Sequence, residues 1–419
     1  SSFVKMQTAA CLLTCLLFVY HASAAPTTAE RLQSKLFSAG WSRRALKPTT
    51  ASSREPRPCH AEPQIALPQG DFSRHPLEAL AMLFLVFYPK AAFKPATAAS
   101  KRRQRAECNE AKRLIRSTWD LSRWSACSFH QRSWPGCRTG KHTVARHSDR
   151  DATINLAEPA IISGVPDSWV DPQHLTLDTL LKRYGNVEWV VGCDDEDCGV
   201  TLSLRTYMDY AKSQHDDAPL YVFDDLILDN FDELASAYTA PQCLKGYDMF
   251  GVLNDDERPP YRWVAIGAKR TGMPPHVDPL YTAAWNHLIS GRKRWFLFPP
   301  ECADRILSKP EACEDSAMHW LHKIYPQLEG LDAAYDFVQQ PGETVYVPDG
   351  WVHAVVNLEL SVAVTHNFLS PHNFDAAYSE LAEDEPDLAG RWLEAIQRDE
   401  TVAATVRSQL DQILAKRKK

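Results

Sequence analysis

The chain has 419 residues, of which 44% are hydrophobic and 24% are charged. These values are ordinary for a globular protein, and they exclude a disordered chain, a collagen-like fibre and a multi-span membrane protein. The net charge of −7 is divided unevenly, because residues 1–150 carry 24 Lys and Arg against 9 Asp and Glu, whereas the remainder carries 22 against 44. A basic front part therefore precedes an acidic body, and we expect the two parts to have different roles.

The first hundred residues contain two apolar runs. Lys5, the run at 9–20 and the small residues at 22–24 have the layout of a secretory signal. A second run lies at 77–88, and both runs are too short to span a bilayer, so we expect no stable membrane span. Residues 1–105 otherwise hold Pro, Ser, Ala and Arg without a clear period, and we expect this basic region to be poorly ordered.

Two basic clusters, at 101–105 and 416–419, compete with the signal-like run as evidence for localisation. Such clusters are either solvated charge or sites of nuclear import or of contact with a nucleic acid such as RNA. We expect a nuclear protein, with the secretory pathway as the alternative. The eleven cysteines are scattered without a CxxC pair, which favours mostly free thiols and no structural zinc.

From about residue 155 the pattern becomes globular and mainly β. Short segments with Gly or Pro between them predict strands at 158–164, 187–191, 220–223, 262–267, 283–289, 294–298, 343–347, 353–357 and 361–368. Helices are predicted after Thr176 and at 206–212, and two or three more between 375 and 414 either close the fold or pair with another copy. This order favours a β-sandwich or barrel with flanking helices.

Three H-x-D motifs begin at His147, His215 and His276. Because side chains alternate along an extended segment, such a motif places an imidazole and a carboxylate on the same side. With one distant histidine it forms a two-histidine, one-carboxylate site, which holds Fe(II) and leaves positions for an oxoacid and O2. The first two motifs lie in polar, loop-like stretches, so we favour His276 and Asp278.

The surroundings of this third motif strengthen the interpretation. Asn286 and Lys293 follow it, with Gly291 expected to form a hairpin turn between them, and His353 begins a later strand. A lysine in a barrel wall is costly unless it meets an anion, which a dicarboxylate would supply. The alternative is that His353 is an ordinary hydrogen-bonded core histidine and Lys293 a solvated charge. Each residue alone favours that alternative, whereas their joint arrangement favours a metal site.

Five segments together carry a family resemblance: PLYVFDD (219–225), PPYRWVAIGA (259–268), HVDPLYTAAWNHLISGRKRWFLFPP (276–300), PGETVYVPDGWVHAVVNLELSVAVTHNF (341–368) and, more loosely, GRWLEAI (390–396). The body resembles the JmjC-domain oxygenases that depend on Fe(II) and 2-oxoglutarate. Within them it is most similar to the jumonji lysyl hydroxylases and reported arginine demethylases once called the phosphatidylserine receptor. The resemblance implies a double-stranded β-helix, a cupin-like jelly roll, over 156–370. A divergent lead-in at 106–155 precedes it, and C-terminal helices with a basic tail follow at 371–419.

The same resemblance implies roles for individual residues. The iron ligands would be His276, Asp278 and His353, and Lys293 would pair with the far carboxylate of 2-oxoglutarate. Further residues would contact this cosubstrate or line its pocket: Asn286, Thr365, Tyr221 and Asn367. One departure is Met273, which stands where the subfamily often has a cosubstrate-contacting threonine, while Thr271 lies two residues away.

The implied activity is hydroxylation of a protein side chain with O2, in which 2-oxoglutarate becomes succinate and CO2. Lysine would yield stable hydroxylysine, whereas a hydroxylated N-methyl group would break down, leaving a demethylated residue. We expect a Lys- or Arg-rich substrate protein such as a histone or splicing factor, RNA contact through the basic clusters, and a homodimer through the C-terminal helices. The alternatives are a non-catalytic binding module for protein or RNA and an oxygenase that acts on RNA or a small molecule.

Overall fold

The computed structural model describes residues 98–136, 142–151, 153–196, 198–255, 257–307, 316–328 and 334–417. The signal-like run, the second apolar run and nearly all of the region expected to be poorly ordered lie outside these residues. Helix α4 (Ala98–Ile115) runs through the expected boundary at residue 105. No helix in the described ranges is both long enough and apolar enough to cross a membrane.

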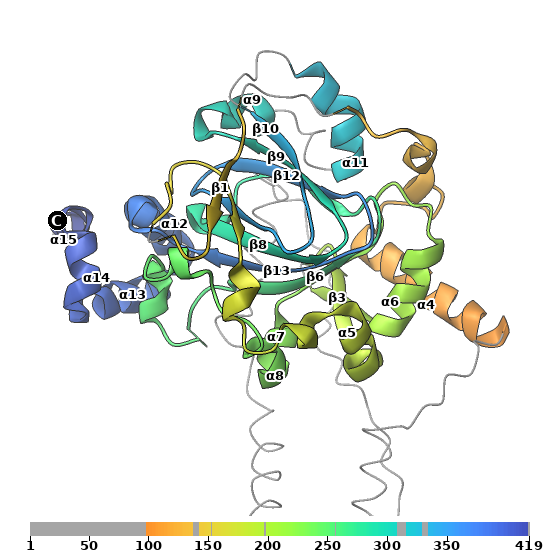
Figure 1. Ribbon diagram of the computed structural model, residues 1–419, viewed down its shortest axis with the longest axis horizontal. Coiled ribbons are helices and arrows are strands. Elements are labelled where there is room, and N and C mark those ends of the chain that lie inside the picture. The colour runs from red at the N-terminus through yellow and green to blue at the C-terminus, as the bar shows by residue number, and fades with distance from the viewer. Residues whose placement is uncertain are drawn as a thin grey trace, which may run out of the picture.

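Two β-sheets face each other and enclose the interior of the domain (Figure 1). The larger sheet has the order β1 (Ala145–Ser148), β2 (Ala160–Ser163), β11 (Thr344–Val347), β8 (Ala283–Ser290), β13 (Ser361–Phe368), β6 (Arg262–Gly267) and β5 (Tyr221–Asp224). The smaller sheet has the order β10 (Tyr335–Gln339), β9 (Lys293–Phe298), β12 (Val352–Asn357) and β7 (Gly272–His276). All pairs are antiparallel except β1 with β2. The expected double-stranded β-helix is confirmed.

Helices cover the outer face of each sheet. The smaller sheet packs Phe296, Phe298 and Val352 against the segment that holds α9 (Ala303–Leu307), α11 (Ala317–His319) and Trp320. The larger sheet is covered by α5 (Leu177–Tyr184), α6 (Leu204–Ser213), α7 (Leu226–Asn230) and α8 (Asp232–Ala235), together with the hairpin of β3 (Glu188–Cys193) and β4 (Gly199–Ser203). Since the outer faces are buried, the central strands lack a polar-apolar alternation.

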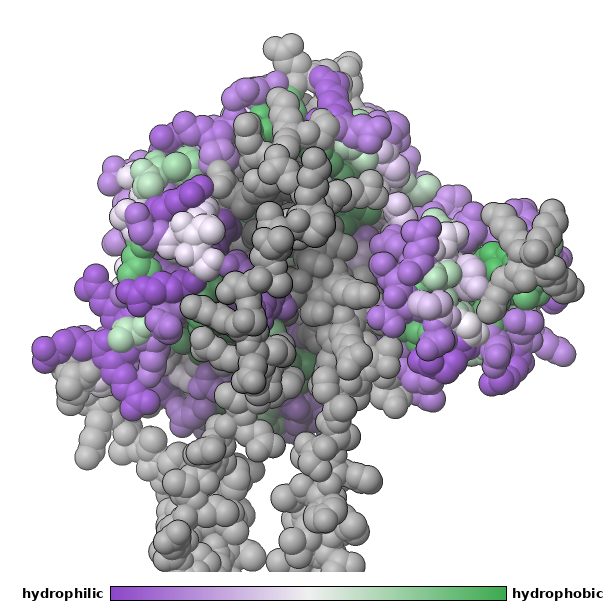
Figure 2. Space-filling model, turned by 180° about the vertical axis from the view of Figure 1, so that it is seen from behind, coloured by the Kyte–Doolittle hydropathy of each residue, from purple (hydrophilic) through white to green (hydrophobic). Residues whose placement is uncertain are grey.

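Four C-terminal helices, rather than the two or three expected, lie to one side of the sheets (Figure 1). They are α12 (Phe374–Asp384), α13 (Pro386–Arg398), α14 (Glu400–Thr405) and α15 (Arg407–Arg417). Phe374 and Trp392 pack with Phe250, and the indole of Trp392 donates a hydrogen bond of 2.9 Å to the carbonyl oxygen of Met249. The helices therefore pack against the segment that precedes β6. On the face shown in Figure 2, hydrophobic residues are scattered among hydrophilic ones.

The strands predicted from the sequence are all present, to within a few residues, and four were missed: β1, β4, β7 and β10. The expected hairpin at Gly291 is wrong, because β8 and β9 lie in different sheets and do not pair. Gly291 has a φ of 85°, and a Cβ there would clash with the carbonyl oxygen of Leu360. This glycine therefore permits the tight passage from one sheet to the other.

The described cysteines are mostly free thiols, as expected. Cys108, Cys127, Cys243 and Cys302 are free thiols, whereas Cys198 is disulfide-bonded.

Candidate active site

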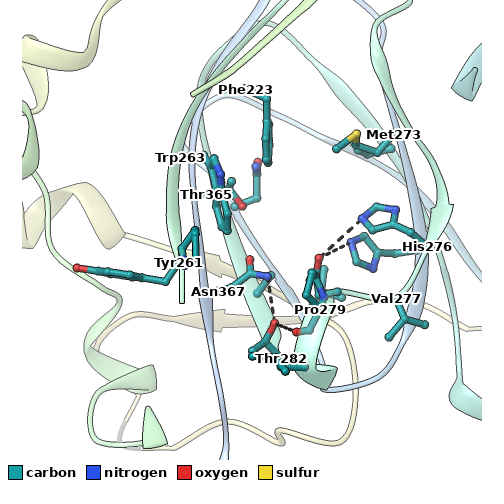
Figure 3. Close-up of a pocket in the computed structure, with 18 of the residues that line it drawn as sticks. Phe223, Tyr261, Trp263, Met273, His276, Val277, Pro279, Thr282, Thr365 and Asn367 are labelled. Carbon is teal, nitrogen blue, oxygen red and sulfur yellow. Dashed lines mark hydrogen bonds and ion pairs between the residues drawn. The ribbon is translucent and has the colours of Figure 1, made fainter. Parts of the chain in front are cut away.

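Two histidines and an aspartate converge between β7 and β12. These strands pair so that His276 lies opposite His353, and the centroids of the two imidazole rings are 4.1 Å apart. Asp278 follows β7 directly, and its Oδ1 is 3.7 Å from Nε2 of His276 and 3.8 Å from Nε2 of His353 (Figure 3). In the described part of the chain this is the one group of three or more His, Cys, Asp or Glu side chains whose donor atoms lie within 4.8 Å of one another.

Hydrogen bonds fix the tautomers of both histidines. Nδ1 of His276 is 2.8 Å from the carbonyl oxygen of Pro274, and Nδ1 of His353 is 3.1 Å from that of Trp351. A carbonyl only accepts, so Nδ1 carries the proton in each ring and Nε2 keeps its lone pair. Burial, together with the neighbouring His353, lowers the pKa of His276 to about 4. Its ring is therefore neutral at pH 7, as a metal ligand must be.

The carboxylate of Asp278 completes a donor set that fits a metal ion. Its Oδ2 is buried and has no hydrogen-bond partner among the described residues. A buried carboxylate oxygen without a partner is costly, and a cation beside the two Nε2 atoms would satisfy it. Two imidazoles and one carboxylate suit Fe(II), and they leave coordination positions for other ligands.

Lys293 lies at the start of β9 and is not the solvated charge of the alternative interpretation. Its side chain is 1% exposed, and Nζ donates a hydrogen bond of 3.2 Å to Oη of Tyr221. Within the described residues no carboxylate lies within 4.0 Å of this ammonium. A buried ammonium paired only with a phenol oxygen is stabilised by an incoming anion.

A single cavity joins the metal-binding side chains to Lys293. Its volume of about 140 Å³ is roughly ten times what one water molecule requires. All eight residues expected from the sequence line it: Tyr221, His276, Asp278, Asn286, Lys293, His353, Thr365 and Asn367. Asn286 has a buried Oδ1 without a partner in the described residues, and Thr365 donates to the carbonyl oxygen of Trp285 at 3.1 Å.

Met273 also lines this cavity, from β7, and packs on the cluster that contains Trp295 and Val355. Thr271 does not take its place. The Thr271 hydroxyl donates to the carbonyl oxygen of Ala268 at 2.7 Å and accepts from Nδ2 of Asn357 at 2.6 Å, and Thr271 is not part of the cavity wall. This wall is therefore apolar at the position where the subfamily that the sequence resembles often has a threonine hydroxyl.

The sequence interpretation missed the aromatic residues of the cavity. Phe223 and Trp263 stack with ring centroids 5.4 Å apart, and Trp295 lies on the opposite sheet. In the sequence they are typical core residues. The two-residue period of a strand could have identified two of them. Phe223 stands two residues after Tyr221, and Trp295 stands two residues after Lys293, so each lies on the same face of its strand as a predicted site residue.

The aspartates of the other two H-x-D motifs accept hydrogen bonds from the backbone and so have a structural role. His147 lies on β1, contrary to the expected loop, and Asp149 accepts from the backbone N–H of Gln242 at 2.5 Å. Asp217 accepts from the backbone N–H groups of Cys127 and Phe129 at 2.8 and 2.6 Å. These carboxylates are occupied by backbone donors, so discounting both motifs as metal sites agrees with the structure.

A cupin-like barrel with a two-histidine, one-carboxylate site beside a buried lysine defines the class of this domain. Residues 263–368 match the family model for the JmjC domain, described as a hydroxylase. These residues are therefore similar to the JmjC domain, and the resemblance seen in the sequence is confirmed.

Curated relatives carry names of the same kind. The chain is 36% identical over 250 residues to the bifunctional arginine demethylase and lysyl-hydroxylase psr-1 of Caenorhabditis elegans, covering 57% of this chain and 62% of that protein. It is 37% identical over 238 residues to the lysine-specific demethylase JMJ21 of Arabidopsis thaliana, covering 54% of this chain and 24% of that protein. It is 29% identical over 144 residues to the mouse 2-oxoglutarate and iron-dependent oxygenase JMJD4, covering 33% of this chain and 32% of that protein. The chain thus spans less than two thirds of each of these relatives.

Proposed function

We propose that this chain is an Fe(II)- and 2-oxoglutarate-dependent oxygenase that hydroxylates protein side chains. The observation that carries the proposal is the convergence of His276, Asp278 and His353 in one cavity with the buried ammonium of Lys293. The names of the relatives, which include demethylases, a lysyl-hydroxylase and an iron-dependent oxygenase, support it.

The residues of the cavity form two binding sites, one for the metal and one for 2-oxoglutarate. His276, Asp278 and His353 would hold the metal, and Lys293 with Tyr221 would hold the far carboxylate of 2-oxoglutarate. When bound, the metal with 2-oxoglutarate and O2 supplies the oxidation of a C–H bond, and the oxoacid leaves as succinate and CO2.

The protein groups around these ligands orient them and exclude water. The Nδ1 hydrogen bonds to Pro274 and Trp351 prevent either imidazole from turning, so both Nε2 atoms stay directed at the carboxylate of Asp278. Met273 gives the cavity an apolar wall on the same strand as His276, and this wall disfavours water beside the metal-binding residues.

Within this activity we favour lysyl hydroxylation over arginine demethylation, with a Lys- or Arg-rich protein such as a histone or splicing factor as substrate. The test is succinate release by the purified chain with Fe(II), 2-oxoglutarate and peptide panels, combined with mass spectrometry of the peptides. A gain of one oxygen on lysine supports hydroxylation, and loss of a methyl group from arginine supports demethylation. His276→Ala should abolish turnover, and His215→Ala is the matched control, because His215 also begins an H-x-D motif but is exposed.

Two alternative functions remain as outcomes of this test. A binding module for protein or RNA would show neither oxoacid binding by calorimetry nor turnover, and Met273 is the residue that favours it. An oxygenase of RNA or small molecules would release succinate without modifying a peptide, and nucleoside mass spectrometry would identify an RNA product.

We further infer a nuclear location and RNA contact from the basic cluster, because Lys101, Arg102, Arg103 and Arg105 are exposed on α4. Imaging a tagged chain with and without residues 1–25 tests the location against the secretory pathway. RNA binding by the chain, before and after charge reversal of the cluster, tests the contact. A homodimer through α12–α15 is tested by sedimentation of the full chain.

A further inference from the structure

The turn that follows Asp278 has a strained backbone. In the turn Pro279–Tyr281, Leu280 has a φ of 54° and Tyr281 has a φ of 51°. Neither residue is glycine, and the left-handed conformation brings the Cβ of an L-residue too close to the following carbonyl oxygen. Such conformations persist only where the surrounding structure imposes them. Contacts from outside the turn must therefore hold these two residues in place.

Leu280 fixes the turn to the C-terminal helices. Its side chain is 3% exposed and belongs to the hydrophobic cluster that contains Phe374, Ala377 and Leu381 of α12. The same side chain lines the cavity, as Asp278 does. If the turn relaxed to an ordinary conformation, Leu280 would leave this cluster and lose its apolar burial. The packing on α12 therefore opposes relaxation of the turn.

Hydrogen bonds fix the remaining part of the turn. The backbone N–H and the hydroxyl of Thr282 both donate to the carbonyl oxygen of Pro279, at 3.2 and 2.9 Å. Nδ2 of Asn367 donates to the Thr282 hydroxyl at 3.1 Å (Figure 3). Nδ2 of Asn373, the residue directly before α12, donates to the carbonyl oxygen of Tyr281 at 3.4 Å. These polar contacts link the turn to β13 and to the start of α12.

The turn also lies beside the segment that orients one of the two histidines. A Cβ on Gly350 would lie 3.8 Å from Cδ1 of Tyr281 and 3.7 Å from Nδ2 of Asn373. Gly350 directly precedes Trp351, whose carbonyl oxygen accepts the hydrogen bond from Nδ1 of His353. A shift of the turn would therefore disturb the neighbourhood of a second metal ligand.

The carboxylate of Asp278 depends on this backbone more than the two imidazoles do. Each imidazole is oriented by a hydrogen bond from its Nδ1. No described residue donates a hydrogen bond to Oδ2 of Asp278, and Oδ1 lies 3.7 and 3.8 Å from the two Nε2 atoms, beyond hydrogen-bond distance. Without such a bond, the position of the carboxylate is set by the chain that carries it.

We propose that Leu280 is a positioning residue for the metal site. Packed on α12, it holds the left-handed turn that places the carboxylate of Asp278 beside the two histidines. The C-terminal helices thereby contribute to metal affinity without contacting the metal. By thermodynamic linkage, metal binding stabilises the packing of α12 to the same extent. This inference rests on the proposed function, because the metal site is part of it.

The first experiment is calorimetric titration of the full chain with Mn(II). Leu280→Ala removes the contact with α12, and its Mn(II) affinity should fall by at least about tenfold, as is typical when the support of a metal ligand is lost. Leu280→Met keeps the apolar volume and should retain the affinity. Leu410→Ala is the matched control, because Leu410 belongs to the same cluster and is also 3% exposed, but lies on α15. It should lose stability in thermal unfolding as Leu280→Ala does and keep the wild-type affinity.

The second experiment is hydrogen exchange of the wild-type chain with and without Mn(II), which requires no variant. Exchange should slow at β7, which carries His276, and also at α12, which contributes no metal ligand. Helix α5, which packs in a different hydrophobic cluster, is the internal control and should not change. In Asp278→Ala the slowing at α12 should disappear.

Three results would overturn the inference: wild-type Mn(II) affinity in Leu280→Ala, an equal loss of affinity in Leu410→Ala, and unchanged exchange at α12 while exchange at β7 slows. Equal slowing at α5 and α12 would also overturn it, because the effect would then be a general stabilisation. If Leu280→Ala does not fold by circular dichroism, the exchange experiment decides. Absence of Mn(II) binding by the wild-type chain would instead overturn the metal site of the proposed function.

Discussion

Replacing Lys293 by methionine should separate the stability of the protein from its affinity for 2-oxoglutarate. The ammonium of Lys293 is 1% exposed and hydrogen-bonded to a neutral phenol, so without an anion it is held at a cost in folding free energy. Methionine has a similar length and no charge. By analogy with replacements of buried charges by apolar residues, the ligand-free variant should be more stable by about 1–3 kcal/mol. At about 2–4 °C per kcal/mol for domains of this size, its Tm should rise by several degrees.

The same change should nearly eliminate binding of the oxoacid. Removing one partner of a buried ion pair costs about 3–5 kcal/mol, which corresponds to a loss of affinity of about 10²–10⁴-fold. At 100 times its Kd, 2-oxoglutarate should stabilise wild type by about 2.7 kcal/mol and leave Lys293→Met unchanged. When the ligand is added, the Tm of wild type should therefore approach or exceed the Tm of Lys293→Met.

Thermal unfolding with Mn(II), with and without 2-oxoglutarate, and calorimetric titration of the oxoacid measure both effects. Lys245→Met is the matched control, since Lys245 is exposed and lies outside the cavity wall. Retention of affinity within tenfold, or a ligand-free variant less stable than wild type, would refute the reasoning about Lys293.

Three further predictions concern the metal, a buried carboxyl and the turn between the sheets. Divalent metal should raise the Tm of wild type, and Asp278→Ala should abolish this rise; an equal rise in both would contradict the assigned donor set. Burial raises the pKa of Asp349 to about 6, above its unfolded value near 3.8, so its contribution to stability is present below pH 4 and lost as the pH rises through 6. Denaturant unfolding should therefore show Asp349→Asn more stable than wild type at pH 8, by at most about 3 kcal/mol, and equal at pH 4. Gly291→Ala should lower the free energy of unfolding by about 2 kcal/mol or more, because its φ is 85° and the added Cβ meets the Leu360 carbonyl; a smaller loss would show that the turn relaxes.

The candidate site could be predicted well because its residues are polar in segments that otherwise read as buried strands. His276 and Asp278 belong to a local motif, and Lys293 and His353 stand at strand ends, so both their types and their positions were visible. The aromatic walls were not, because Phe223 and Trp263 bury their rings as any core residue does. The Nδ1 hydrogen bonds of His276 and His353 have no signature in the sequence, since they depend on local backbone geometry.

The strands were largely predictable and their pairing was not. The apolar segments around Gly291 predict two strands and a turn, but a hairpin and a passage between sheets have the same pattern. β7 was missed as a strand because Pro274 and Pro275 interrupt its pattern, although the side-by-side placement of His276 and Asp278 was expected. Its neighbour β12 provides the pairing that places His276 beside His353.

The side chains around the cavity come from two separate layers of the protein. The metal donors and Lys293 belong to the smaller sheet and its flanking turn, whereas Tyr221, Asn286, Thr365 and Asn367 belong to the larger one. Any molecule that binds to side chains of both sets connects the two sheets across the cavity. Hydrogen exchange of the backbone amides should therefore slow on ligand binding at β7 and β12 and also at β13 in the other sheet. The ligand-bound barrel would then be a more rigid surface for binding a polypeptide.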